Sequence, residues 1–214
     1  KGRYNISAMG TAINLGNITG QEHFSTCNIQ GSAEGNINTL TNFNIELSEL
    51  QFKGYTYSPI TINGTAGKEF IKATASTEDP NASAMLGLTY KHNRKGNKLD
   101  IHLAVDSFIP HNLNLKYKEP HIFSFTADGE YEHRDNGKSL TNIKIQNFCH
   151  NDGKEATNIQ YFHLYDDNTE EKRSITINSD ILNADIVGYF NTDNLIGSYI
   201  KLIDRHLPAL NIHK

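Results

Sequence analysis

The chain has 214 residues, enough for one sizeable β domain, and only 37% are hydrophobic, with a mean hydropathy of -0.54. Its 20 basic and 24 acidic residues give a net charge of -4 and are scattered, so no basic tract favours a nucleic-acid partner. No run of about 18 apolar residues is present, and the sequence therefore predicts no membrane-spanning helix.

The chain opens with KGRYNIS, which already alternates like a strand and is unlike a signal peptide. We expect a mature protein or, preferably, an internal segment of a longer chain, folded as a single β domain over residues 1–214. Cys27 and Cys149 are the only cysteines and fit no metal-binding spacing. Two partly buried free thiols are favoured over a disulfide between them.

Strand-like segments recur along the chain and are joined by short turns rich in Asn, Asp and Gly, such as NRKGNK, HRDNGKS and NDGKE. Short turns between successive strands predict an antiparallel meander. No linker divides the chain. The fold class that follows is all-β, with neighbouring strands in chain order.

Apolar and polar side chains alternate within these strands. In KLDIHLAVDSF, residues 98–108, Leu103 and its apolar partners share one face, while Asp100 and His102 share the other. The apolar stripes comprise Ala82, Ala84, Leu86, Leu88 and Tyr90; Leu99, Ile101, Leu103 and Val105; Phe123, Phe125, Ala127 and Tyr131; Ile143 and Ile145; Ile175 and Ile177; Ala184, Ile186 and Phe190. On periodicity alone, these stripes favour the core of a closed β-sandwich, whose two sheets would meet across about 10 Å.

Residues 193–207 predict an amphipathic helix that ends at Pro208. A plug over the open end of a sheet is favoured over a membrane-surface helix, because the polar side carries mixed charge. PHNLNL, residues 110–115, predicts a loop or a single turn.

Catalytic and metal-binding signatures are missing from the sequence. It contains no GxSxG, HExxH, Walker loop or dinucleotide fingerprint, and its 10 histidines form no ligand frame. His102 beside Asp100 and Asp106 fits a solvent-facing strand better than a cation site, and TEDPNAS fits a turn at Pro80 better than a calcium loop. A hydrolase would need two carboxylates on the inner face, and none is convincingly placed there. We therefore expect a protein without enzymatic activity, metal or cofactor.

Three stretches resemble the TamB family of the AsmA-like group, in its long Bacteroidetes-type form. They are Leu50–Tyr90 with the pattern GYxYxxIxxxG, Ala104–Leu115 with HNLNL, and Ser174–Leu210 with SDxxxAxIxGxFxxxxL before a helix that ends in LP. Their order also matches, and together they cover most of residues 50–210.

The resemblance implies an elongated antiparallel sheet curled into an open, taco-like groove with one C-terminal amphipathic helix. Proteins of this family are anchored in the inner membrane, extend through the periplasm, and are implicated in phospholipid movement and outer-membrane protein assembly. The chain would be a lipid-transfer segment whose partners are phospholipid acyl chains and, through the full-length protein, outer-membrane assembly proteins. The residues implied to line the groove are Leu86, Leu88, Leu99, Ile101, Leu103, Val105, Phe123, Phe125, Ile143, Ile145, Ile175, Ile177, Ile186 and Phe190.

One alternative and two irregularities accompany this interpretation. The rival is a closed β-sandwich that serves as a secreted adhesion or ligand-binding module, which would lack the large exposed apolar strip of a groove. Open edges could pair an isolated fragment into a dimer. Asn147 and His163 fall near the apolar side of their strands, which predicts either a bulge or a discontinuous lining.

Overall fold

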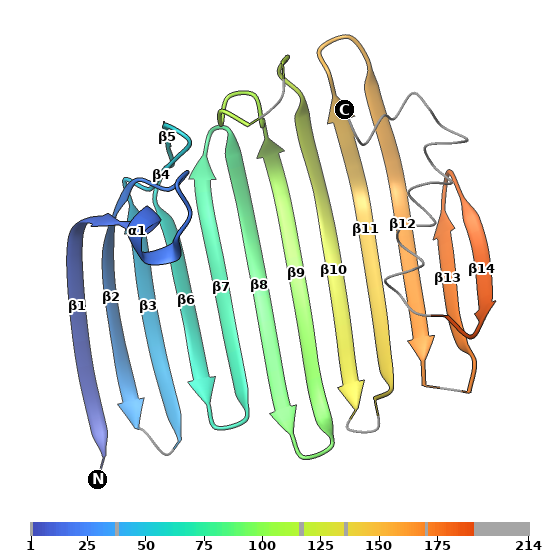
Figure 1. The fold of residues 1–214 in the computed structure, drawn as a ribbon, viewed down its shortest axis with the longest axis horizontal. Helices are drawn as coiled ribbons and strands as arrows, with labels where there is room; N and C mark the ends of the chain where they lie inside the picture. Colours follow the sequence, from blue (N-terminus) through green and yellow to red (C-terminus); the bar gives the residue numbers. More distant parts are fainter. Residues whose placement is uncertain (1, 37–38, 116–117, 135–136, 170, 191–214) are drawn as a thin grey trace.

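A computed structural model of the chain describes residues 2–36, 39–115, 118–134, 137–169 and 171–190. The helix predicted over residues 193–207 lies outside these ranges. The described chain forms a twelve-stranded antiparallel sheet, a two-stranded hairpin and one short helix (Figure 1).

The large sheet follows chain order, interrupted only where the small hairpin β4–β5 intervenes between β3 and β6. The elements are β1 (Arg3–Asn14), α1 (Leu15–Thr19), β2 (Thr26–Asn36), β3 (Leu40–Ser48), β4 (Gln51–Phe52), β5 (Tyr55–Thr56), β6 (Ile60–Gly67), β7 (Phe70–Asp79), β8 (Ala82–Asn93), β9 (Gly96–Phe108), β10 (Ile122–Arg134), β11 (Ser139–Asn151), β12 (Ala156–Asn168), β13 (Arg173–Ser179) and β14 (Asn183–Gly188). The predicted all-β antiparallel meander is confirmed.

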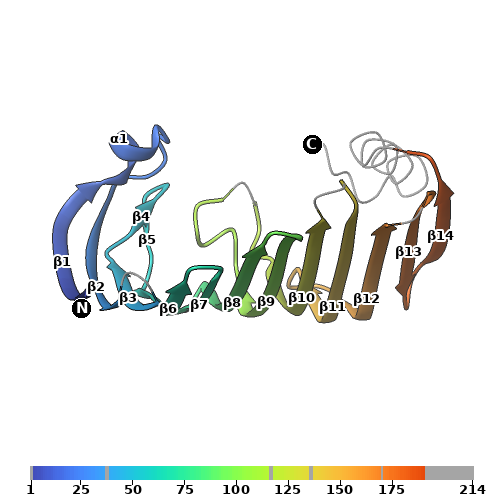
Figure 2. The same cartoon turned by 90° about the horizontal axis from the view of Figure 1, so that it is seen from below.

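The sheet is open and curved. Its flanks, β1–β2 and β13–β14, turn up toward the same side, which also carries α1 and the β4–β5 hairpin (Figure 2). Strands β1 and β14 are its two edges within the described residues, and pairing of an isolated fragment through such an edge stays a prediction.

Most of the sheet has no second layer packed on it. A compact chain of 24.0 kDa exposes about 9,900 Å², whereas this chain exposes 14628 Å². Among the described residues, the buried apolar side chains are Cys27, Pro110, Leu113, Ile175 and Ile177. The apolar stripes therefore do not face each other across a sandwich, and the closed architecture of the rival interpretation is not the observed fold.

The two ends of the sheet differ. At one end, which we call the hairpin end, lie the short connections from β2 to β3, β6 to β7, β8 to β9, β10 to β11 and β12 to β13. At the other, which we call the capped end, lie α1, the β4–β5 hairpin and the segment between β9 and β10 (Figure 1). Residues 110–115 turn as predicted, with hydrogen bonds from the Asn112 amide to the Ile109 carbonyl and from the Leu115 amide to the Pro110 carbonyl.

Glycine is required at the turn between β8 and β9. Gly96 has a φ of 144°, and a Cβ at this position would lie 2.0 Å from the carbonyl oxygen of His133 on β10. We expect Gly96→Ala to destabilise the chain by more than about 2 kcal/mol, because both the backbone conformation and the contact oppose a side chain. Chemical denaturation measures this loss. Gly137→Ala is a control for conformation alone, since its φ is 75° but nothing lies within 4 Å of the added Cβ; an equal loss in both variants would rule out the contact with His133.

Candidate functional site

One face of the sheet is apolar across its whole width. The strand register places directly beside one another, from β1 to β14, the residues Ile6, Ala33, Phe43, Gly64, Ala73, Leu88, Ile101, Gly129, Ile143, Leu164, Ile177 and Ala184. We call this set the apolar row. It contains no polar side chain on any of the twelve strands.

The next row of residues points to the opposite face and is polar apart from one glycine. It runs through Ser7, Ser32, Asn44, Asn63, Thr74, Gly87, His102, Asp128, Lys144, His163, Asn178 and Asn183. Side chains alternate between faces along every strand, so the sheet is amphipathic as a whole.

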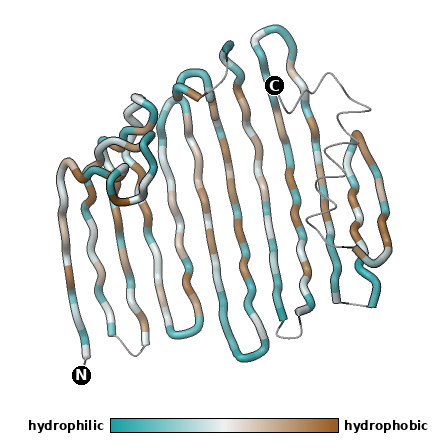
Figure 3. The backbone as a smooth tube through the Cα atoms, in the orientation of Figure 1, coloured by the Kyte–Doolittle hydropathy of each residue, from teal (hydrophilic) through white to brown (hydrophobic). Residues whose placement is uncertain are grey.

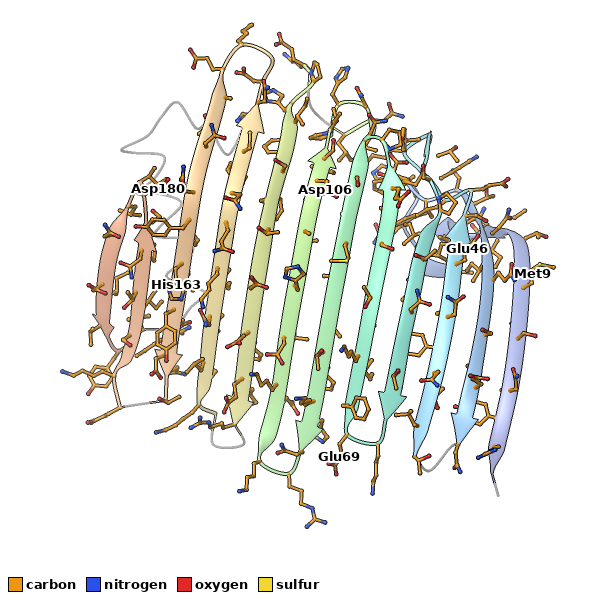
Figure 4. All side chains as sticks on the ribbon, turned by 180° about the vertical axis from the view of Figure 1, so that it is seen from behind. Met9, Glu46, Glu69, Asp106, His163 and Asp180 are labelled. Atoms are coloured by element: carbon orange, nitrogen blue, oxygen red, sulfur yellow. The ribbon has the colours of Figure 1, made fainter. Side chains whose placement is uncertain are left out.

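The apolar row lies on the concave side. Figure 4 shows the sheet from behind, with α1 on the far side, and the labelled Met9, Glu46, Asp106 and His163 belong to the polar face. The apolar row therefore faces the hollow side seen in Figure 2. Along the central strands, hydrophobic residues concentrate in the middle, and the turns that join β6 to β7, β8 to β9 and β11 to β12 are hydrophilic (Figure 3). The result is an apolar band that runs across the strands.

The structure brings the predicted lining residues together on this concave face. Leu86 and Leu103 are directly opposite each other, and Leu103 is opposite Ala127 on the other side. By register the same face holds Leu88, Leu99, Ile101, Val105, Phe125, Ile143, Ile145, Ile175, Ile177 and Ile186. Leu86 is 37% exposed, whereas Ile175 and Ile177 are buried. Their role in holding lipid stays a prediction.

Two predicted lining residues lie at the margins of the face. Phe123 stacks on the His150 ring, with centroids 4.7 Å apart, near the capped end. Phe190 lies beyond the last strand, and its ring centroid is 5.6 Å from the guanidinium carbon of Arg173. Both are half-buried.

The structure resolves the two irregularities noted from the sequence. Asn147 has a φ of 53°, and the β10–β11 register shifts beside it, so the predicted bulge is present. The assignment of His163 near the apolar side is wrong: it is paired with Lys144 on the polar face, and its Nε2 lies 2.7 Å from Oδ1 of Asn142. The lining is continuous at that strand because Phe162 and Leu164 on either side point inward.

Sequence reasoning missed the part of the concave face that lies on the first three strands. A hollow of about 440 Å³ there is lined mainly by apolar side chains and glycines, among them Ile6, Ile13, Ile29, Phe43 and Ile45. The alternation in NFNIELSEL, residues 42–50, was the available signal. The hollow arises because Ala8, Gly31 and Ala33 leave room that larger side chains would fill.

The buried carboxylate of Asp79 links segments of the capped end through hydrogen bonds. Asp79 is 1% exposed and accepts hydrogen bonds from the Tyr55 hydroxyl at 2.7 Å, the Ser58 amide at 2.8 Å and the Asn81 amide at 2.9 Å. Burial acts to raise the pKa of Asp79, but these hydrogen bonds outweigh it and hold the pKa below its usual value. The β4–β5 hairpin is thereby tied to the turn between β7 and β8.

The hydrogen-bond network continues from these segments to the turn after β9. The Asn112 side-chain amide donates to Oδ1 of Asn81 at 2.8 Å, and that of Asn114 donates to the carbonyl of Lys53 at 3.0 Å. Leu113 between them is 1% exposed. Phe24 and Phe52, with ring centroids 4.7 Å apart, join the segment after α1 to the hairpin. These segments form one connected wall at the capped end of the concave face.

One ion pair interrupts the apolar surface, near the hairpin end of β12 and β13. Arg173 donates through Nε to Asp166 Oδ1 at 2.7 Å and also through Nη2 to Oδ2, with both side chains 11% exposed. The hydrogen bonds that Arg173 donates to the Asp166 carboxylate raise the pKa of Arg173. Two-point pairing of this kind neutralises both charges where water is scarce.

The described residues carry no arrangement suited to catalysis on a metal. They contain no group of three or more His, Cys, Asp or Glu side chains placed to bind one. Within the same ranges no helix is long and apolar enough to cross a membrane. Cys27 and Cys149 are free thiols, as predicted, and burial raises the pKa of Cys27.

Comparison with known proteins adds no assignment: the chain matches no protein-family model, no curated protein and no solved structure.

Proposed function

We propose that the chain is a non-enzymatic, TamB-like lipid-transfer segment whose concave face holds phospholipid acyl chains. The observation that supports this most is the apolar row, which crosses twelve strands without a polar side chain and has no second sheet against it. Soluble monomers rarely leave an apolar strip of this extent exposed unless it binds something.

The chemistry of the row suits a mobile acyl chain. Each methylene transferred from water contributes about 0.8 kcal/mol, so a dozen methylenes contribute on the order of 10 kcal/mol before entropy losses. Leu, Ile, Phe, Ala and Gly side chains make no directional hydrogen bonds, so a lipid held by them is free to slide. Such a surface needs no catalytic residue.

The cellular setting is part of the same proposal. Through its resemblance to TamB, the chain is proposed to act in the periplasm as part of a longer protein anchored in the inner membrane. There it would carry phospholipid between the two membranes and contribute to outer-membrane biogenesis with assembly proteins.

Photo-crosslinking in cells tests the lipid path directly. A benzophenone side chain at Leu103 is expected to yield a phospholipid adduct, because this position is in the middle of the concave face. The same group at His102, one residue away on the polar face and bonded through Nδ1 to Asp128 Oδ1 at 2.7 Å, is the control. Efficient photolysis at Leu103 without any lipid adduct would reject the proposal.

A further inference from the structure

The concave face is recessed over β1, β2 and β3. The hollow of about 440 Å³ described above lies there, at the flank that turns up in Figure 2. Its floor consists of three small residues on two adjacent strands: Ala8 is directly opposite Gly31, and Ala33 follows Gly31 on the same face of β2. We call this recess the flank hollow.

The walls of the flank hollow are large apolar side chains that lie over neighbouring glycines. The Phe43 ring covers Gly64, where an added Cβ would be 2.2 Å from the ring atom Cζ. Ile13 covers Gly10 in the same way, with its Cδ1 atom 2.5 Å from an added Cβ. Because these two side chains lie beside the floor, the space above the three small residues stays open.

The backbone does not require a glycine at position 31. Its φ is not in the positive range, and an added Cβ would be 3.4 Å from the Asn44 carbonyl oxygen and 3.6 Å from Ile45 Cγ1, which are ordinary contact distances. A larger residue therefore fits the strand at Gly31, although glycine inside a strand weakens it. Glycine at such a position is typical of a site where another group approaches the backbone closely.

The lining offers a ligand no polar side chain. Ser32 is the one polar residue among those that line the flank hollow, and the register places it beside Ser7 and Asn44 on the polar face. The ligand that fits is therefore a hydrocarbon. A cavity of about 150 Å³ with a lining of this kind binds one benzene molecule. The flank hollow, at about 440 Å³, takes roughly three times as much, or about 18 carbons, which is one acyl chain.

An acyl chain fits this recess better than a second copy of the protein does. A flat sheet laid across the recess would leave it empty, and the lining would gain no contacts there. A flexible chain lies within the recess. It enters over an open rim, since Ile6 on β1 is 60% exposed.

We propose that the flank hollow is a fixed binding position for one acyl chain of a phospholipid, and that Gly31 sets its capacity. The inference rests on the proposed function and adds to it a place where a lipid stops: a chain slides along the apolar row and is held between walls at the β1 flank. Ile6, Ala33 and Phe43 belong both to the apolar row and to the flank hollow. A chain therefore passes from one to the other without crossing polar surface.

Titration of the full 214-residue chain with cis-parinaric acid, a fluorescent fatty acid with one chain, tests the site. We expect the wild type to bind one equivalent tightly. Gly31→Leu fills the flank hollow and is expected to lower this affinity on the order of a hundredfold, because its four side-chain carbons displace about four ligand methylenes that contribute about fourfold each. Ala33→Leu is a second variant with the same expected direction, and far-ultraviolet circular dichroism verifies that both variants are folded.

Two other glycines provide matched controls. Gly129→Leu adds the same side chain to the apolar row in the middle of the concave face, and Gly87→Leu adds it to the polar face. At neither position does an added Cβ come closer than 3.7 Å to an atom of a non-adjacent residue. Both controls are expected to change the affinity for the tightly bound equivalent less than about threefold.

The outcomes separate the flank hollow from the lipid path. Unchanged affinity in Gly31→Leu, or an equal loss in Gly129→Leu, would overturn the fixed position, while a phospholipid adduct at Leu103 would still support the path. Loss of tight binding in Gly31→Leu without a Leu103 adduct would support the hollow and reject the path.

Two further measurements identify the occupant. Lysophosphatidylcholine is expected to displace cis-parinaric acid from the wild type, and failure to do so would overturn the proposal by assigning the flank hollow to free fatty acids. Light scattering reports the oligomeric state of the protein without ligand. A wild-type dimer that Gly31→Leu converts to a monomer would overturn the proposal in favour of a second copy of the chain.

Discussion

We expect Leu103→Asp to lower the phospholipid affinity of the chain on the order of a hundredfold while the sheet remains folded. Leu103 lies between Leu86 and Ala127 on the concave face. In the empty protein, a carboxylate there stays hydrated because the face has no second layer. A bound acyl chain would strip that water from the charge, and this desolvation penalty is what lowers the affinity.

Ala104→Asp is the matched control. Ala104 is the next residue on the same strand, between Met85 and Thr126 on the polar face, so the new charge is identical and only its side of the sheet differs. Binding of a fluorescent phospholipid by the purified chain measures both affinities, and far-ultraviolet circular dichroism verifies the fold. Equal affinities for the two variants would contradict a lipid path on the concave face. Global unfolding of Leu103→Asp would show that another part of the protein covers the concave face around Leu103.

The second large effect is expected at Asp79, whose carboxylate joins three elements at the capped end. Asp79→Ala leaves the Ser58 and Asn81 amides and the Tyr55 hydroxyl without their acceptor. We expect a loss of on the order of 4 kcal/mol in the free energy of unfolding, because each buried donor left unsatisfied costs about 1–3 kcal/mol. Chemical denaturation gives the value. Asp185→Ala on the exposed side of β14 is the control and is expected to cost less than about 0.5 kcal/mol.

The stabilisation that Asp79 gives to the folded chain decreases as the pH falls. Its folded-state pKa is held below its usual value by the three donors, so the unfolded chain takes up a proton first as the pH falls. The stabilisation is therefore complete above the unfolded pKa of about 3.9 and decreases below it. We expect the difference in unfolding free energy between wild type and Asp79→Asn to be large at about pH 7 and smaller at about pH 3. A difference that is the same at both pH values would contradict an ionised Asp79.

Much of the fold and of the concave face was accessible from the sequence. The alternation from Leu99 to Val105 predicted a strand with one apolar side, and the structure places that side on the concave face. Alternation is informative because the side-chain period of a strand is two at any position. The Asn147 bulge was also foreseen as one of two explanations for a polar residue in an apolar stripe.

Other features required information that no single segment contains. On periodicity alone the stripes favoured a sandwich, because an apolar side of a strand looks the same whether a second sheet covers it or not. His163 was assigned to the wrong face because the register of β12 depends on its partners rather than on its own pattern. The first fifty residues match the TamB motifs only in general style, and so Ile6 and Phe43 were not among the predicted lining residues.

The sequence by itself determined that the chain forms amphipathic strands joined by tight turns in chain order, since alternation and turn chemistry are local properties. The tertiary structure decided which residues become neighbours across strands, which way the sheet curves, and that Ala8, Gly31 and Ala33 adjoin at one flank while Asp79 links the segments of the capped end. The physical reason is that register and curvature arise from pairing between separate segments, where a shift of one residue would exchange the two faces of the sheet.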